Sequence, residues 1–216
     1  MKKLRSPIVW FGGKGRMIAK LLPILTAWPH QRYCEPFGGG ASVLLAKPPV
    51  DVETYNDLDG GLVNFFRVLA DETDFQQFYR RVALLPYSRE LYYEYWQNWR
   101  EAEDRVEQAA RWFVAARQSF SGTFGKSWSM AVTASSRGMP CTCARWLSAI
   151  DHLPEVHTRL QRVQMEQMDF RVILDRYDTD TTLFYCDPPY VHATRKGRKY
   201  AYEMTNADHC DMIEML

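Results

Sequence analysis

The stretch TTLFYCDPPY, residues Thr181–Tyr190, combines a strand-forming run with an abrupt stop. Its β-branched, aromatic and apolar residues predict a buried strand, and Pro188 and Pro189 end that strand because proline has no amide hydrogen to donate to a sheet. Asp187 and Tyr190 are therefore expected at the carboxyl end of a strand, on a loop that the prolines stiffen. In open α/β sheets, ligands bind at this edge.

The sequence on either side alternates strands, turns and helices. Further strands are predicted to end near Glu35 and at Asn56, and a fourth covers VQMEQ, residues 163–167. Helix-forming segments follow these strands, among them ASVLLA, residues 41–46, and Gly61–Leu69. This order predicts an α/β fold with a doubly wound, Rossmann-like parallel sheet.

The middle of the chain has a different character. Residues 74–118 and 144–160 are helix-forming, with Leu91, Tyr95 and Trp99 at helical spacing, and residues 121–140 read as an ordered loop rich in Gly, Ser and Thr. We therefore predict a discontinuous sheet domain of residues 1–69 and 163–216, interrupted by a mostly helical insertion of residues 70–162.

The last predicted helix, NADHCDMIEML, stops at Leu216 in the middle of an amphipathic pattern and without a C-terminal cap. A doubly wound sheet normally continues with further strands after such a helix. We therefore expect the chain to be a piece of a longer protein, with C-terminal strands missing.

Composition excludes several classes of protein. Of the 216 residues, 46% are hydrophobic and 25% are charged, which is typical of a soluble globular protein. No signal peptide or membrane-spanning run is present, and the five cysteines lack a C-x-x-C spacing, so a reduced, cytoplasmic location is expected. Cys141, Cys143, His152 and His157 do not have a standard zinc spacing, and no metal is predicted.

Charge is unevenly distributed although the net charge is only +1. Between Gln108 and Ile150 there is no Asp or Glu, whereas five Lys or Arg residues alternate with aromatic side chains. Cations neutralise phosphates and aromatic rings stack on bases, so the pattern suits nucleic acid, although a helical core with a solvated basic face has about even odds. Trp112 and Phe113 fit a helical core better. The loop Ser121–Gly138 is the better candidate for reading base edges.

Two glycine-rich turns and one acid resemble parts of a nucleoside site. EPFGGGAS, residues 35–42, lies between a strand and a helix, where glycines allow a ligand to approach the backbone closely. Asp57, after the next strand, is placed to accept hydrogen bonds from a ribose diol, whereas Asp59 is explained as a helix N-cap. WFGGKG, residues 10–15, is not a phosphate loop, and Lys14 is expected to meet a carboxylate instead.

Taken together, these motifs resemble the Dam-like, D12 class of N6-adenine-specific DNA methyltransferases, with phage and prophage members the most similar in character. The matching order is WFGGK, EPFGGG, the acid at Asp57, a helical insertion that contains RQSFSGTFG, residues 117–125, and DPPY. The resemblance implies S-adenosylmethionine as cofactor, duplex DNA as substrate and DNA methylation of the kind used in restriction–modification. It also implies a bacterial or phage-infected host cell.

Residue roles follow from the same resemblance. The implied cofactor contacts are Trp10, Lys14, Glu35, Pro36, Phe37, Gly38, Gly40, Asp57, Asp169, Phe170 and Asp187. The implied catalytic loop is Asp187, Pro188, Pro189 and Tyr190. Candidate DNA contacts are Arg117, Ser121, Lys126, Arg137, Arg195 and Lys196.

The chemistry explains why this reaction needs DPPY. The exocyclic amine of adenine is a poor nucleophile, and two acceptors on its N–H groups favour a lone pair aimed at the methyl donor. The Asp187 carboxylate and the Pro188 carbonyl can be those acceptors, while Tyr190 stacks on a flipped-out base.

The remaining alternatives for the function are a cytosine-N4 or RNA methyltransferase, and a truncated, non-catalytic DNA-binding protein of the same fold.

Overall fold

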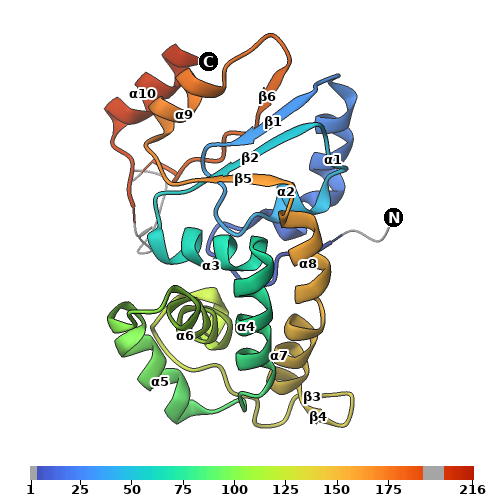
Figure 1. The fold of residues 1–216 in the computed structure, drawn as a ribbon, viewed down its shortest axis with the longest axis vertical. Helices are drawn as coiled ribbons and strands as arrows, with labels where there is room; N and C mark the ends of the chain where they lie inside the picture. Colours follow the sequence, from blue (N-terminus) through green and yellow to red (C-terminus); the bar gives the residue numbers. More distant parts are fainter. Residues whose placement is uncertain (1–3, 192–201) are drawn as a thin grey trace.

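The computed structural model describes residues 4–191 and 202–216, so Arg195 and Lys196 lie outside the described residues (Figure 1). A parallel sheet has the strand order β5-β2-β1-β6. Its strands are β1 (Arg32–Glu35), β2 (Val52–Asn56), β5 (Val163–Glu166) and β6 (Thr182–Phe184). When these four strands are numbered by their order in the chain, their order across the sheet is 3-2-1-4. This is the beginning of the doubly wound strand order, so the predicted α/β fold class is confirmed.

The strands alternate side chains between two apolar layers, as the two-residue period of a strand requires. Leu183 and Tyr185 pack on the main core, whereas Phe184 and Cys186 pack on a second cluster with Phe170. Helices α1, α2, α3 and α8 contribute to the main core, and α9 and α10 to the second cluster. The sheet is therefore covered on both faces, as a parallel sheet needs to be.

The helices of the described residues have the following bounds. They are α1 (Ile18–Ala27), α2 (Ser42–Ala46), α3 (Gly60–Ala70), α4 (Glu72–Ala83), α5 (Arg89–Asn98), α6 (Arg105–Gln118), α7 (Cys141–Asp151), α8 (Leu153–Leu160), α9 (Phe170–Tyr177) and α10 (Asn206–Met215). Short 3₁₀ turns are η1 (Lys14–Arg16), η2 (Trp99–Glu101) and η3 (Phe120–Gly122). A two-residue hairpin pairs β3 (Ser135–Ser136) with β4 (Met139–Pro140). None of the helices described is long and apolar enough to cross a membrane.

Helices α4 to α7 gather on one side of the sheet, below it in Figure 1. Their core is continuous with that of the sheet, because Phe65 of α3 stacks on Phe113 of α6 at 5.3 Å between ring centroids. Trp112 and Phe113 are buried, as predicted for helical core residues. The segment predicted as an insertion therefore shares one apolar core with the sheet.

Two helix predictions need correction. Trp99 is not on α5, because that helix ends at Asn98 and Trp99 begins the turn η2. Residues 144–160 do not form one helix, because α7 ends at Asp151 and α8 begins at Leu153. Pro154 lies in the first turn of α8, where its missing amide hydrogen costs nothing, but inside a longer helix it would break the hydrogen-bond ladder.

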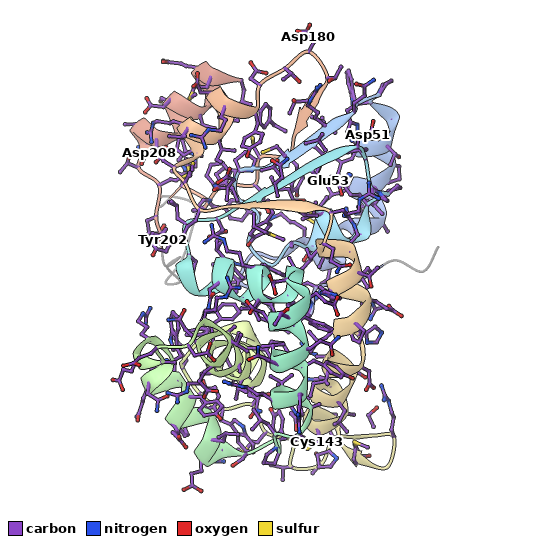
Figure 2. All side chains as sticks on the ribbon, viewed as in Figure 1. Asp51, Glu53, Cys143, Asp180, Tyr202 and Asp208 are labelled. Atoms are coloured by element: carbon purple, nitrogen blue, oxygen red, sulfur yellow. The ribbon has the colours of Figure 1, made fainter. Side chains whose placement is uncertain are left out.

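A buried ionic cluster joins the sheet to α8. Glu53, in the middle of β2, contacts Lys47 Nζ at 2.6 Å and Arg159 Nη1 at 2.6 Å (Figure 2). Arg159 also donates a hydrogen bond of 2.9 Å to the Leu44 carbonyl of α2. Because one carboxylate serves two cations, the cluster ties the returning helix α8 to the sheet.

Candidate active site

A pocket opens at the carboxyl ends of the strands, where the strand order reverses between β1 and β6. At this point the loops after neighbouring strands diverge and leave a crevice. The pocket is lined by residues 10–14, 35–40, 42–43, 56–59 and 168–170, by Tyr185, Asp187 and Pro189, and by 202–204 and Asp208. Segments from six parts of the chain therefore meet at one edge of the sheet.

All eleven predicted cofactor residues line this pocket. They are Trp10, Lys14, Glu35, Pro36, Phe37, Gly38, Gly40, Asp57, Asp169, Phe170 and Asp187. Of the predicted catalytic loop, Asp187 and Pro189 line the pocket, whereas Pro188 and Tyr190 are not among the lining residues. Tyr190 stands beside it with 48% of its surface exposed.

The pocket also contains residues that sequence reasoning missed. Asn56, like Asp57, lies at the carboxyl end of the second predicted strand, and this position could have identified it as a pocket residue. Tyr202, Glu203 and Met204 line the pocket from the segment that leads into α10, and Asp208 lines it from the first turn of α10. Figure 2 shows Tyr202 and Asp208 on the α9–α10 side of the molecule. No sequence motif marks this wall, because it depends on how the chain returns to the sheet.

The glycine turn after β1 is held tightly against β2. The Gly38 amide donates to the Asn56 carbonyl at 2.7 Å, and the Tyr55 hydroxyl donates to the Gly39 carbonyl at 2.7 Å. A Cβ atom at Gly38 would overlap the Tyr55 ring. Glycine is therefore required at position 38 so that the turn can approach β2 and leave its backbone facing the pocket.

The Asp57 carboxylate is partly buried directly after β2 and receives two backbone hydrogen bonds. Gly39 donates to Oδ2 and Asp59 donates to Oδ1, both at 2.9 Å. Burial raises the pKa of Asp57 to about 6, although these hydrogen bonds oppose the rise. A carboxylate has about four lone-pair sites, so Asp57 can still accept hydrogen bonds from a ligand. Asp59 caps α3 through Gly61 and Leu62, as predicted.

Lys14 joins the first glycine turn to the DPPY loop. Its ammonium group is ion-paired with Asp187 Oδ2 and lies 5.3 Å from the centroid of the Tyr190 ring. Burial lowers the pKa of Lys14, but the bonds to Asp187 and Tyr190 outweigh this effect and the pKa is raised overall. Burial raises the pKa of Asp187, and Lys14 opposes that rise. The carboxylate predicted to meet Lys14 is thus, in this structure, Asp187 of the protein itself.

Glu35 lines the pocket but is nearly inaccessible, with 2% of its surface exposed. The Tyr33 hydroxyl donates to its Oε1 at 2.8 Å. Burial raises the pKa of Glu35 to about 8, against the opposing effects of Tyr33 and Lys47. At neutral pH this carboxyl group is therefore largely protonated.

Aromatic side chains form the apolar parts of the pocket. Phe170 packs on Phe37, with 5.4 Å between ring centroids, and Asp169 caps α9 by accepting from the Arg171 amide at 2.9 Å. The ring centroids of Trp10 and Trp112, on α6, are 5.8 Å apart. The pocket is thus connected directly to the helical region by an aromatic contact.

The lining residues carry an excess of negative charge. Among those described, seven are acidic, namely Glu35, Asp57, Asp59, Asp169, Asp187, Glu203 and Asp208, and one, Lys14, is basic. Asp169 and Asp208 are paired with Arg171, and Asp187 is paired with Lys14, but an excess of negative charge remains even with Glu35 protonated. This electrostatic character favours a ligand with positive charge.

The predicted DNA-contacting residues that the structure describes occupy three places. Ser121 and Lys126 are exposed on the loop between α6 and the hairpin, whose Gly122 packs on Val9 next to the first glycine turn. Arg137 is at the tip of the β3–β4 hairpin, at the opposite end of the molecule from the sheet, where its guanidinium group contacts Ser148 (Figure 1). Arg117 is mostly turned inward and donates to the Arg145 carbonyl at 2.9 Å.

In the part of the chain that the structure covers, no group of three or more His, Cys, Asp or Glu side chains is arranged to hold a metal ion. Cys143 lies among the lower helices in Figure 2, far from the pocket.

Comparison with known proteins gives a family for this arrangement. No curated protein matches the chain. Residues 10–214 match the D12 class N6 adenine-specific DNA methyltransferases, a range that includes the glycine turns, the helical segment and the DPPY loop. The target amine is therefore N6 of adenine in DNA, and not N4 of cytosine or an RNA base. The chain belongs to the D12 class of N6 adenine-specific DNA methyltransferases.

Proposed function

We propose that the pocket binds S-adenosylmethionine and that the DPPY loop holds a flipped-out adenine beside it. When bound, this cofactor supplies a methyl group on a positively charged sulfur, which is open to attack by an amine. The residues present fit such a group, because the pocket has seven acidic lining residues against one lysine. This charge excess and the position at the strand-order reversal support the assignment.

The nucleoside part of the cofactor is assigned to the β1–β2 side of the pocket. Asp57 would accept hydrogen bonds from the ribose diol, and Phe170 with Phe37 offers an apolar surface to the adenine ring. The turn at Gly38, which has no side chain, leaves room for the ligand beside the backbone. These residues would bind and orient the cofactor, and none of them has to take part in the chemical step.

Asp187 and the Pro188 carbonyl are proposed to accept the two N–H bonds of the target amine. Two acceptors at fixed positions orient the nitrogen lone pair toward the methyl group and stabilise the positive charge that develops on nitrogen. Lys14 contributes by favouring the ionised form of Asp187. A carboxylate can accept a further N–H while it is ion-paired, because it has about four lone-pair sites.

Tyr190 is proposed to stack on the flipped base. Its ring is half exposed at the mouth of the pocket and is bounded on one side by the Lys14 ammonium group. A base inside a duplex cannot reach the Asp187 carboxylate, so the enzyme must take it out of the helix and replace the stacking that the base has lost.

We infer that residues 70–162 read the DNA, with the loop of residues 119–129 as the part nearest the pocket. In this loop Lys126 and Ser121 are exposed, and Phe120 exposes 60% of its surface, which suits phosphate contact and stacking on bases. Because its substrate is DNA, we also propose that the enzyme acts in the cytoplasm of a bacterial or phage-infected cell. The observation that carries the proposal is the meeting of Asp187, Asp57 and Lys14 in one pocket.

The decisive experiment measures transfer of a labelled methyl group from S-adenosylmethionine to unmethylated duplex DNA, with nucleoside analysis of the product. We expect N6-methyladenine from the wild-type chain and a rate at least about 100-fold lower for Asp187→Asn, because the amide is a neutral, weaker acceptor and cannot stabilise the positive charge that develops on the amine nitrogen. Asp180→Asn, at the exposed turn before β6 (Figure 2), is the matched control and should keep full activity. Near wild-type turnover by a folded Asp187→Asn protein would exclude the proposed role.

DNA reading is tested by affinity at several salt concentrations. Lys126→Ala should weaken DNA binding and reduce the slope of log K against log salt by about 0.9, the value for one phosphate contact. Lys20→Ala, an equally exposed lysine on α1, should leave both unchanged. Identical slopes for the two variants would remove Lys126 from the interface.

A further inference from the structure

Asn56, the last residue of β2, is buried beside Asp57 and has no part in the chemistry proposed above, yet all of its hydrogen-bonding groups are used. Its Nδ2 donates to the Pro36 carbonyl at 2.8 Å and to the Met168 carbonyl at 3.0 Å. Its Oδ1 accepts from the Met168 amide at 2.8 Å, and its own carbonyl accepts from Gly38 at 2.7 Å. A side-chain amide has two N–H donors and one carbonyl oxygen, so this set is complete.

These bonds join the loops that follow three neighbouring strands. Pro36 follows β1, Met168 follows β5, and Asn56 ends β2, which lies between them in the sheet. Each bonded residue is next to a part of the pocket wall, namely the glycine turn, Asp57 and the pair Asp169 and Phe170. The Asn56 side-chain amide therefore links all three loops to one another.

We propose that Asn56 is a positioning residue for the cofactor pocket, which sets the distance between the Asp57 carboxylate, the glycine turn and the Phe170 ring. The inference rests on the proposed function, because it assumes that these three groups bind one ligand. Only an amide satisfies the bonding pattern, since two main-chain carbonyls and one main-chain amide face it. A carboxylate could keep the bond from Met168 but would repel both carbonyls.

The test is the nearly isosteric variant Asn56→Asp, measured by calorimetric binding of S-adenosylhomocysteine, a ligand that requires no turnover. We expect binding to weaken by about tenfold or more, because two buried donors are lost. DNA affinity at matched salt should stay within about twofold. In steady-state kinetics the KM for S-adenosylmethionine should rise while kcat at saturation changes little, because the residue acts through binding.

Asn64→Asp is the matched control. The Asn64 amide, on α3, likewise donates to a main-chain carbonyl, that of Arg105 at 3.0 Å, but it is outside the pocket. This variant should bind S-adenosylhomocysteine as the wild type does. Asn56→Ser is the second variant, which adds no charge and keeps one hydroxyl donor, and it should weaken binding less than Asn56→Asp.

The outcomes separate the inference from the proposed function. If the wild-type chain is folded and does not bind S-adenosylhomocysteine, the proposed function fails. If the wild type binds it and a folded Asn56→Asp protein binds it equally well, the positioning role alone is wrong. Should Asn56→Asp not fold, equal binding by Asn56→Ser and the wild type would overturn the inference instead.

Discussion

The ammonium group of Lys14, in the first glycine turn, is ion-paired with the carboxylate of Asp187, in the DPPY loop. Both side chains are largely buried, with 14% and 21% of their surfaces exposed. Burial alone would favour the neutral form of the carboxyl group, and the lysine opposes this. The first glycine turn thus controls the charge of the residue proposed to accept the target amine.

Replacing Lys14 should therefore change the pH dependence of methyl transfer. In Lys14→Met the pKa of Asp187 rises further, so the ionised fraction at a given pH falls. The acid limb of the kcat/KM profile should move upward by about 1 pH unit, the lower end of the effect expected for a neighbouring opposite charge. Lys20→Met, on the exposed face of α1, serves as control. An acid limb at the wild-type position in Lys14→Met would contradict the role.

Cofactor binding should depend on the protonation of Asp57. Its pKa is raised to about 6 by burial, so the carboxyl group is ionised above pH 6 and becomes neutral as the pH falls through that value. A neutral group is a weaker acceptor for a ribose diol, and S-adenosylhomocysteine should bind up to about tenfold more weakly at pH 5 than at pH 7. Calorimetry over this range measures the effect.

Asp57→Asn provides the comparison, because its affinity should be weak and nearly flat between pH 5 and pH 7. Glu35 does not confuse the result, since its pKa of about 8 places its titration at higher pH. The same pH dependence in wild type and Asp57→Asn would assign the effect to another group.

The buried ionic cluster on β2 should be a major contributor to stability. Glu53→Gln leaves Lys47 and Arg159 charged, buried and without their common carboxylate. We expect the free energy of unfolding to fall by about 3–5 kcal/mol, the cost of breaking a buried ion pair from one side. Urea denaturation measures this loss.

A surface pair is the control for the cluster. Asp104 contacts Arg81 at 3.3 Å with both side chains at least 40% exposed, so Asp104→Asn should cost about 1 kcal/mol or less. Similar losses for Glu53→Gln and Asp104→Asn would show that the cluster adds little.

The loop between α6 and the hairpin should be sensitive to substitution at Gly125, whereas the turn of the β3–β4 hairpin should be tolerant at Gly138. Both glycines have a positive φ, 74° and 71°, but a Cβ at Gly125 would overlap the Trp96 ring, whereas a Cβ at Gly138 meets nothing within 4 Å. Gly138→Ala should cost only the left-handed conformation, about 1–2 kcal/mol. Gly125→Ala should cost about 1–3 kcal/mol more because of overpacking.

Thermal or urea unfolding compares the two glycine variants, and DNA affinity adds a functional measurement. Gly125→Ala should weaken DNA binding, because the displaced backbone carries the neighbouring Lys126 with it. Equal stabilities for the two variants would mean that the loop accommodates a side chain beside Trp96.

Local sequence signals predicted most of the elements correctly. Strand β6 ends before the prolines and Asp59 caps α3, as expected from residue types that act on their immediate neighbours. The two helix boundaries that differ from the prediction also have local causes. The spacing of Trp99 continues the apolar pattern of α5, but the helix ends before it, and the turn around His152 is not visible in a periodic pattern that runs through it.

Residue types and their spacing were enough to predict where the strands end, where glycine permits a tight turn and that the fold is a parallel sheet, because these follow from backbone sterics and short-range periodicity. Three features are visible only in the folded molecule: Lys14 meets Asp187, Asn56 joins three loops, and the segment before α10 forms a pocket wall. Such contacts link residues far apart in the chain. They depend on strand order, register and side-chain direction, which no local pattern encodes.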